Sequence, residues 1–383
     1  MANVFTVALA KTQDLKIYGY STVLQRICSE ICELEERGFS LHANGQQIFA
    51  TLCVVHGDNL GRHTILGFQE SFIAMRFCSH CMITQDSLQT CFDTDNSLLR
   101  TKKSVDYQIK EVLADKTGVK QKEYGIKSRC PLLDTKFWHI ANNRVGDLLH
   151  DVLEGIGPYE TKAVLHRLVE VEKRFTLQQL NSRIVYFGYG PTDTKNRSVE
   201  IFVLRALYSK GDKSLKQRGL PFWCLLRLLP LMVADFVPEG NTYWEFFLEL
   251  RQICDVLFVQ KRSGGVSEQF RQLYHSHLRN LSRLFPDLTL IPKHHFVSHY
   301  ALFAESTGPP YKSMLATEEM KGNFFKRTSS IMCNFKNVTL SLAKKHQLAA
   351  YANILSGKVF ADNISADKVI RMPIACALFG RTN

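Results

Sequence analysis

The 383-residue sequence predicts an α+β fold that is predominantly helical. Apolar residues recur at spacings of three and four along many segments, which is the period of amphipathic helices. One early stretch, QIFATLCVV (47–55), differs because nearly every position is apolar and several are β-branched. That composition is typical of a central strand covered on both faces. The content of 45% hydrophobic and 22% charged residues is that of a folded globular chain.

The N-terminal region is expected to hold one helix and then this strand. A helix over 16–37 would place five apolar side chains on one stripe and end at Gly38; they are Tyr20, Leu24, Ile27, Ile31 and Leu34. Asn44-Gly45 marks a turn before the strand. Asp58 lies just beyond the carboxyl end of the strand, where functional sites on such sheets collect.

The middle of the chain, residues 93–290, is predicted to be an all-helical insertion between residues 1–92 and 291–383. It contains two helices around Gly155–Pro158, a buried helix at 220–237, and amphipathic helices at 241–262 and 266–285, with a break at 263–265. Arg227 and Pro230 interrupt the apolar segment 220–237, so no membrane span is expected.

The charge of the chain favours a polyanionic partner, with nucleic acid first. The formal net charge is +12 and the pI is near 9.1. A long helical pattern runs to about residue 355. The segment 320–361, which overlaps this pattern, contains no acidic residue. Its seven basic residues could lie along a phosphate backbone or form an ordinary solvated face; they are Lys321, Lys326, Arg327, Lys336, Lys344, Lys345 and Lys358.

A pair of cysteines, Cys78 and Cys81, indicates a metal site. The 11 cysteines are an odd number and no secretory leader precedes them, so reduced intracellular thiols are expected, with Cys28 and Cys32 in the core. Zinc sites commonly combine two close pairs of Cys and His. The second pair would be His294 or His295 with His299, more than 200 residues further on.

A compact local zinc site is the competing geometry, and it would use His80 or Cys91 in place of the distant histidines. Two acids stand at equal distances outside the predicted ligands. Asp58 precedes Cys78 by 20 positions, and Glu319 follows His299 by 20. One metal joining the two pairs would therefore carry both carboxylates toward a common site.

Clustered carboxylates suit Mg²⁺, and two such ions can support phosphoryl transfer. Glu318 is an alternative to Glu319, and both could instead be an acidic helix N-terminus favoured by the helix dipole.

The order of acid, Cys pair, insertion, His pair and acid resembles that of the CACTA-type DDE transposases and of their relative, the catalytic subunit of the antigen-receptor gene recombinase. Several stretches also look like transposon-derived proteins of animals, among them GDNLGRHTILGFQESF, DLLHDVLEGIGPYE, IPKHHFVSHY and GNFFKR. The resemblance covers residues 1 to about 352.

The resemblance implies a partial RNase H-like core, interrupted by the helical insertion and bracketed by a Cys₂His₂ zinc site. Asp58 matches the second catalytic Asp and Glu319 the catalytic Glu, both as Mg²⁺ ligands, and the residues that match the zinc ligands are Cys78, Cys81, His294 and His299. The implied activity is metal-dependent DNA strand cleavage and transfer. Structural Zn²⁺, catalytic Mg²⁺, a DNA partner and nuclear residence follow from the same resemblance, which is compatible with a homodimer.

The sequence departs from that family at the first catalytic Asp. Before Asp58 the acids are Asp14, which lacks the expected strand context, and four glutamates of the predicted helix. We therefore expect an incomplete triad, a truncated or decayed transposase core, and little or no activity from this chain alone. The alternatives are a non-enzymatic zinc-stapled protein that binds DNA or protein, and an unstable relic.

A further acid–histidine group lies in the insertion. Asp147, His150, Asp151 and Glu154 share one helical face. They could form an additional metal or DNA contact, with Asp147 as a catalytic acid, or simply a polar helix cap.

Overall fold

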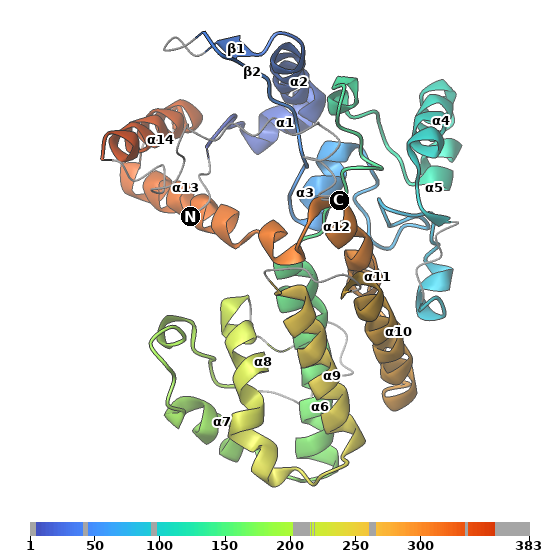
Figure 1. Ribbon diagram of the computed structural model, residues 1–383, viewed down its shortest axis with the longest axis vertical. Helices are drawn as coiled ribbons and strands as arrows, with labels where there is room; N and C mark the ends of the chain where they lie inside the picture. The colour runs from blue at the N-terminus through green and yellow to red at the C-terminus, as the bar shows by residue number, and fades with distance from the viewer. Residues whose placement is uncertain are drawn as a thin grey trace.

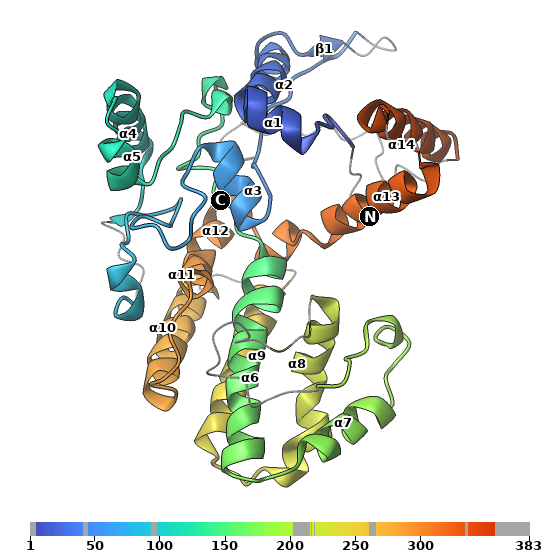
Figure 2. The same ribbon diagram turned by 180° about the vertical axis from the view of Figure 1, so that it is seen from behind.

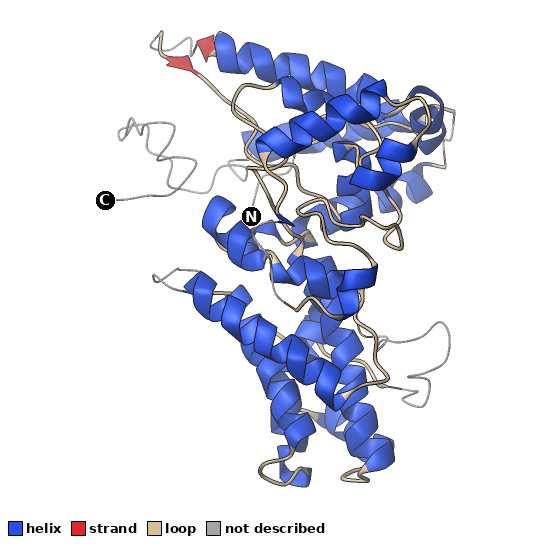
Figure 3. Ribbon diagram, turned by 90° about the vertical axis from the view of Figure 1, so that its right-hand side faces the viewer, coloured by secondary structure: helices blue, strands red, loops and turns tan. Residues whose placement is uncertain are grey.

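The computed structural model describes residues 5–40, 45–92, 98–201, 215, 217, 219–259, 266–333 and 336–356. Throughout these ranges the chain is predominantly helical, with strand confined to one short hairpin (Figure 3). The expectation of a helix-rich fold is therefore confirmed.

The N-terminal helix is close to its predicted range. Helices α1 (Thr12–Tyr18) and α2 (Tyr20–Glu36) meet at Gly19, whose φ of 77° breaks what would otherwise be one helix. Cys28 of α2 is buried, and its Sγ donates to the carbonyl oxygen of Pro131 at 3.2 Å. Cys32 lies beside it, with 4.0 Å between the two Sγ atoms.

The predicted central strand over 47–55 is wrong. Only a two-residue ladder forms, in which β1 (Phe39–Ser40) pairs antiparallel with β2 (Gln47–Ile48). From residue 49 to residue 58 the chain forms neither helix nor strand, and Phe49 is 59% exposed. A β-branched apolar run becomes a buried strand only where neighbouring strands pair with it on both sides. No other described segment supplies such a neighbour.

A second group of helices packs with α2. It comprises α3 (Asn59–Leu66), α4 (Lys102–Ala114), α5 (Val119–Tyr124) and the short turn η3 (Pro131–Asp134), whereas the turn η1 (Asp86–Gln89) places Leu88 in the core of the insertion. Leu66 of α3, Val105 of α4 and Trp138 share a core with Cys28. Residues of the predicted insertion up to about 141 thus pack against the N-terminal region.

The long helical segment that follows is broken at Gly155. It runs through η4 (Leu149–Ile156), which has the wider π-helical turn, then α6 (Gly157–His166) and η5 (Arg167–Val171). The backbone of Gly155 is non-helical, at φ −120° and ψ −108°. The sequence-based break around Gly155–Pro158 is confirmed, although helix resumes within one residue.

The remaining helices of the insertion form a bundle with α6 (Figures 1 and 2). They are α7 (Leu177–Tyr186), η6 (Thr194–Asn196), α8 (Leu220–Val233), η8 (Ala234–Phe236), α9 (Thr242–Leu257) and α10 (Val266–Leu284). The predicted helices at 220–237, 241–262 and 266–285 are confirmed, and the predicted break at 263–265 lies outside the described residues. Phe222, Leu226, Phe247 and Leu250 are buried in the bundle core.

The C-terminal part places the predicted His pair against the insertion. Helix α11 (Pro292–Ser298) packs on η4 and α10, and α12 (Tyr300–Thr307) follows it, then the turn η9 (Pro310–Ser313). The predicted continuous pattern to residue 355 is two packed helices, α13 (Ala316–Met332) and α14 (Val338–Leu355). Cys333, at φ 48°, ends the first of them. Among the described residues, no helix is both long and apolar enough to cross a membrane.

Candidate metal centre

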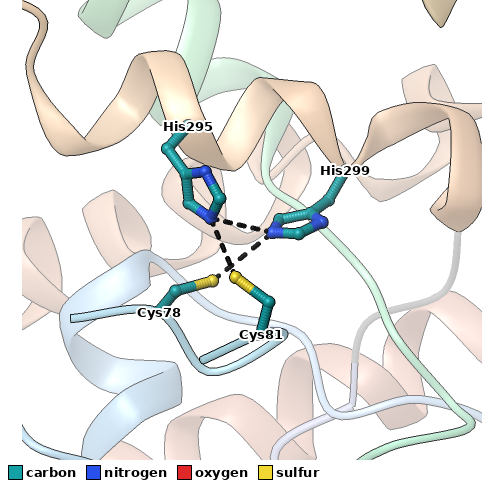
Figure 4. A group of neighbouring side chains, drawn as sticks. All are labelled: Cys78, Cys81, His295 and His299. Carbon is teal, nitrogen blue, oxygen red and sulfur yellow. Dashed lines mark hydrogen bonds between the residues drawn. The ribbon is translucent and has the colours of Figure 1, made fainter. Parts of the chain in front are cut away.

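Two cysteines and two histidines from distant parts of the chain meet in one buried cluster. Cys78 Sγ lies 3.5 Å from His299 Nε2, and Cys81 Sγ lies 3.2 Å from His295 Nε2. The two Nε2 atoms are 3.0 Å apart, and all four ligand atoms lie within 4.8 Å of one another. Figure 4 shows both imidazoles directed from one helix toward the two sulfurs of a loop.

The geometry fits a tetrahedral zinc ion. Zn–S bonds of about 2.3 Å and Zn–N bonds of about 2.0 Å place neighbouring ligand atoms roughly 3.3 to 3.8 Å apart. The sulfur–nitrogen distances of 3.2 and 3.5 Å lie in or next to that interval. Cys₂His₂ is a donor set that zinc prefers. The residues present therefore fit a single four-coordinate metal ion.

The surroundings of the sulfurs favour thiolates. The His80 N–H donates to Cys78 Sγ at 3.3 Å, and the Ile83 N–H donates to Cys81 Sγ at 3.5 Å. Burial opposes ionisation of Cys78, but the hydrogen bond from Cys81 and the nearby histidines hold the pKa of Cys78 well below its usual value. The hydrogen bond that Cys81 donates to Cys78 raises the pKa of Cys81, and burial adds to that increase. Zinc binds cysteine as the thiolate, so binding of a metal ion here would release thiol protons.

Of the two histidines that the sequence left open, His295 lies in the cluster and His294 does not. The five positions from His294 to His299 turn the side chain by about 500° along a helix, which leaves the two about 140° apart, whereas the four positions from His295 to His299 turn it by about 400°, which leaves them about 40° apart. His295 and His299 thus share a face, and His294 points elsewhere. Its Nε2 lies 3.1 Å from Glu160 Oε1.

The two residues considered for a local site are outside the cluster. The His80 ring is 5.5 Å from the ring of His299 and 4.6 Å from that of Phe303, so it packs among aromatic rings. Cys91 is partly buried against the insertion core. The described cluster consists of Cys78, Cys81, His295 and His299.

Buried guanidinium groups surround the thiols. Arg100 is 1% exposed and donates to Cys78 O at 3.3 Å and to Gln108 Oε1 at 2.7 Å. Burial lowers its pKa to about 10, against the attraction of Cys78 and Cys81. Arg144 is also buried and donates to Arg100 O. These cations stabilise negative charge on the sulfurs.

Asp58 caps a helix and is exposed. Its Oδ1 accepts from the Gly61 N–H at 2.6 Å, which makes it the N-cap of α3. The next residue, Asn59, is buried and donates to Asp151 Oδ1 at 2.5 Å, and Asp151 Oδ2 accepts from Tyr300 OH at 3.0 Å. Burial raises the pKa of Asp151. The Asp58 helix is therefore fixed to η4.

Glu319, on α13, lies beside His150. Its Oε1 is 3.9 Å from His150 Nε2, and its side chain is 52% exposed. His150 Nδ1 pairs with Asp147 Oδ2, and that bond is the main cause that raises the pKa of His150. Asp147 Oδ1 also accepts from the N–H groups of Leu149 and Leu315. The side chain of Glu318 lies outside the described residues.

A lysine connects the metal helix with the acidic group. Lys293 Nζ donates to His150 O at 2.6 Å and to Glu154 O at 3.4 Å. Burial lowers the pKa of Lys293, while the charges of Asp151, Glu154, Asp147 and Asp58 oppose that shift. Asp58 and the three acids at residues 147, 151 and 154 thus act on the same lysine. The sequence-based grouping of Asp147, His150, Asp151 and Glu154 on one helical face includes three of the acids that act on Lys293.

The basic residues of the C-terminal segment lie on the α13–α14 hairpin. The exposed ones are Lys326, Arg327, Lys336, Lys344 and Lys345. Lys321 is partly covered, with its Nζ 5.3 Å from the ring centre of Phe324. Lys358 lies outside the described residues.

Comparison of the sequence with known protein families and with curated proteins finds no match.

Proposed function

We propose that this chain is a transposase-derived protein whose zinc centre joins an N-terminal Cys pair to a C-terminal His pair across a helical insertion. The meeting of these two pairs in one buried cluster is the observation that carries the proposal. The order of acid, Cys pair, insertion, His pair and acid supports an ancestral role in metal-dependent DNA strand cleavage and transfer on an RNase H-like core. Such a role implies nuclear residence and DNA as partner.

The zinc in this proposal is structural. Four protein side chains fill a tetrahedral coordination sphere, and each of them is buried, so no position is left for water or substrate. The ion would hold α11 against the loop that carries the Cys pair. Its binding free energy would add to the free energy of unfolding.

The chemistry is assigned to the exposed carboxylates of Asp58, at the N-cap of α3, and Glu319, on α13. Both have oxygen atoms available to a hard cation, and bound Mg²⁺ would activate a water or a DNA hydroxyl there. Asp147 is fully buried and uses its oxygens on His150, Leu149 and Leu315, so its role is to orient His150. With two accessible carboxylates, activity is expected to be weak.

A nicking assay on supercoiled DNA with Mg²⁺ or Mn²⁺ tests the catalytic assignment. Asp58→Asn and Glu319→Gln should each abolish nicking, whereas Asp14→Asn, which changes an exposed acid of α1, should leave it intact. Nicking that persists in both of the first two variants at the rate of the unmodified chain would remove the assignment.

A second candidate function is non-enzymatic binding of DNA or protein by a zinc-stapled helical scaffold. The observation that favours it is the small amount of strand: two strands of two residues are all that the described ranges contain, whereas a catalytic RNase H-like core depends on a sheet. DNA binding that is retained by Asp58→Asn, with no nicking by any form of the chain, would select this candidate over the first.

A further inference from the structure

Helix α11 is held by a buried carboxylate that two histidines share. Glu160, on α6, is completely buried, with Oε1 3.1 Å from His294 Nε2 and Oε2 2.7 Å from His277 Nε2. Because the Ile291 N–H donates to His294 Nδ1 at 2.9 Å, the ring proton of His294 is on Nε2, and this nitrogen donates to Glu160. A carboxylate in such a position is tolerable only when its oxygens are hydrogen-bonded.

The other end of the group is anchored on α9 and α10. His277 Nδ1 lies 3.2 Å from Glu249 Oε2, and Phe246 stacks on the His277 ring at 4.2 Å. Burial would lower the pKa of His277, but Glu160 and Glu249 raise it to about 9. Burial would likewise raise the pKa of Glu160, yet His277 and His294 lower it to about 2. The Glu160 carboxylate is therefore tied to the bundle independently of α11.

The backbone of α11 is fixed at the same residue. Tyr274, also on α10 and fully buried, donates its hydroxyl to His294 O at 2.9 Å. Two positions before α11 begins at Pro292, the Gln89 side chain exchanges two hydrogen bonds of 2.9 Å with the backbone of Leu290. Both the side chain and the carbonyl oxygen of His294 are thus held by hydrogen bonds, and the next residue is His295 of the cluster.

We propose that Glu160 is a positioning residue of the metal centre, which fixes the rotation of α11 through His294 and so directs His295 at the Cys pair. Neighbouring residues of a helix point about 100° apart, so holding one imidazole sets the direction of the next. Glu160 also occupies the Nε2 atom of His294, which keeps that imidazole out of the ligand set. This inference rests on the metal centre of the proposed function.

The test is the zinc affinity of the full chain, measured by competition with a chromophoric chelator. Glu160→Gln keeps the shape of the side chain but weakens its bond to His294, and should reduce the affinity at least tenfold. It should also change the visible spectrum of the Co²⁺-substituted protein, which reports the ligand geometry. Glu245→Gln, an exposed glutamate of α9, is the control and should change neither.

Circular dichroism would reveal whether Glu160→Gln folds. If it does not fold, a milder variant takes its place in the test. Tyr274→Phe removes one hydroxyl and should still reduce the affinity about threefold. If Glu160→Gln, or in its place Tyr274→Phe, has the affinity and Co²⁺ spectrum of the unmodified chain, the positioning role is refuted. Failure of the unmodified chain itself to bind zinc would instead refute the metal centre, which distinguishes the two proposals.

Discussion

A difference of one residue determines which imidazole reaches the metal centre. His294 and His295 are adjacent, yet one bonds to Glu160 and the other meets the Cys pair. The helical turn per residue could have identified His295 from the sequence, because a spacing of four keeps two side chains on one face of a helix. The partner of His294 carries no such signal, since Glu160 is 134 residues away.

Single substitutions should separate the distributed zinc site from a local one. Cys78→Ser and His299→Ala each remove a ligand, and both should reduce the zinc content from one ion per chain to nearly none, as measured by inductively coupled plasma mass spectrometry. Cys91→Ser is the matched control, because Cys91 is nearby in sequence but outside the cluster, and it should keep one zinc. Retention of one zinc in His299→Ala together with loss of zinc in Cys91→Ser would point to a local site.

The pair of Glu160 and His277 should make stability depend on pH. His277 has a folded-state pKa of about 9 against 6.5 as its ordinary value, so its contribution is complete below pH 6.5 and is lost as the pH rises to 9. A shift of that size corresponds to about 3 kcal/mol of unfolding free energy. Urea unfolding between pH 6.5 and 9 should show this decline, and the double variant Glu160→Gln/His277→Gln should lose it. Parallel profiles for the two proteins would contradict the ion pair.

At the scale of elements, amphipathic helices were predictable and the strand was not. The ranges 241–262 and 266–285 carry apolar stripes that α9 and α10 bury. The run 47–55 has strand composition, but strand formation depends on partners that lie elsewhere in the chain. The glycine and proline at Gly155–Pro158 predicted the break in the helix. They did not predict that the side chain of Lys293 packs against Gly155.

Gly155 should be intolerant of a side chain. A Cβ atom there would lie 2.7 Å from Lys293 Cδ and 2.8 Å from His150 O, so the lysine would have to leave. We expect Gly155→Ala to reduce the free energy of unfolding by about 2 kcal/mol. Gly190→Ala, where no atom lies within 4 Å of the added carbon, should change it by less than about 0.5 kcal/mol. Equal losses of unfolding free energy in the two variants, measured by urea denaturation, would show that Lys293 is not closely packed against Gly155.

The α13–α14 hairpin should supply part of any DNA affinity. Lys344→Glu/Lys345→Glu reverses two exposed charges and should weaken binding at least tenfold at physiological salt, while lowering the slope of log affinity against log salt by about 2. Lys103→Glu/Lys110→Glu, on exposed positions of α4, alters the net charge equally and controls for it. Fluorescence anisotropy with a labelled duplex measures both; equal losses in the two variants would show that net charge alone determines the affinity.

At the scale of the whole molecule, the metal centre joins segments that are more than 200 residues apart in sequence. Cys78 and His299 are separated by 221 positions, and Cys81 and His295 by 214. The residue types and the pairwise spacing indicated a zinc site, but nothing in one sequence states that two distant pairs meet. Their contact depends on how α11 packs on η4 and α10, which is decided by buried contacts along the whole insertion.

The most direct test of this account is X-ray absorption spectroscopy at the zinc edge on the purified full chain. We predict one zinc per chain with two sulfur neighbours at about 2.3 Å and two nitrogen neighbours at about 2.0 Å. A protein isolated without zinc, or a zinc ion with three or four sulfur neighbours, would contradict the joining of the Cys pair to His295 and His299.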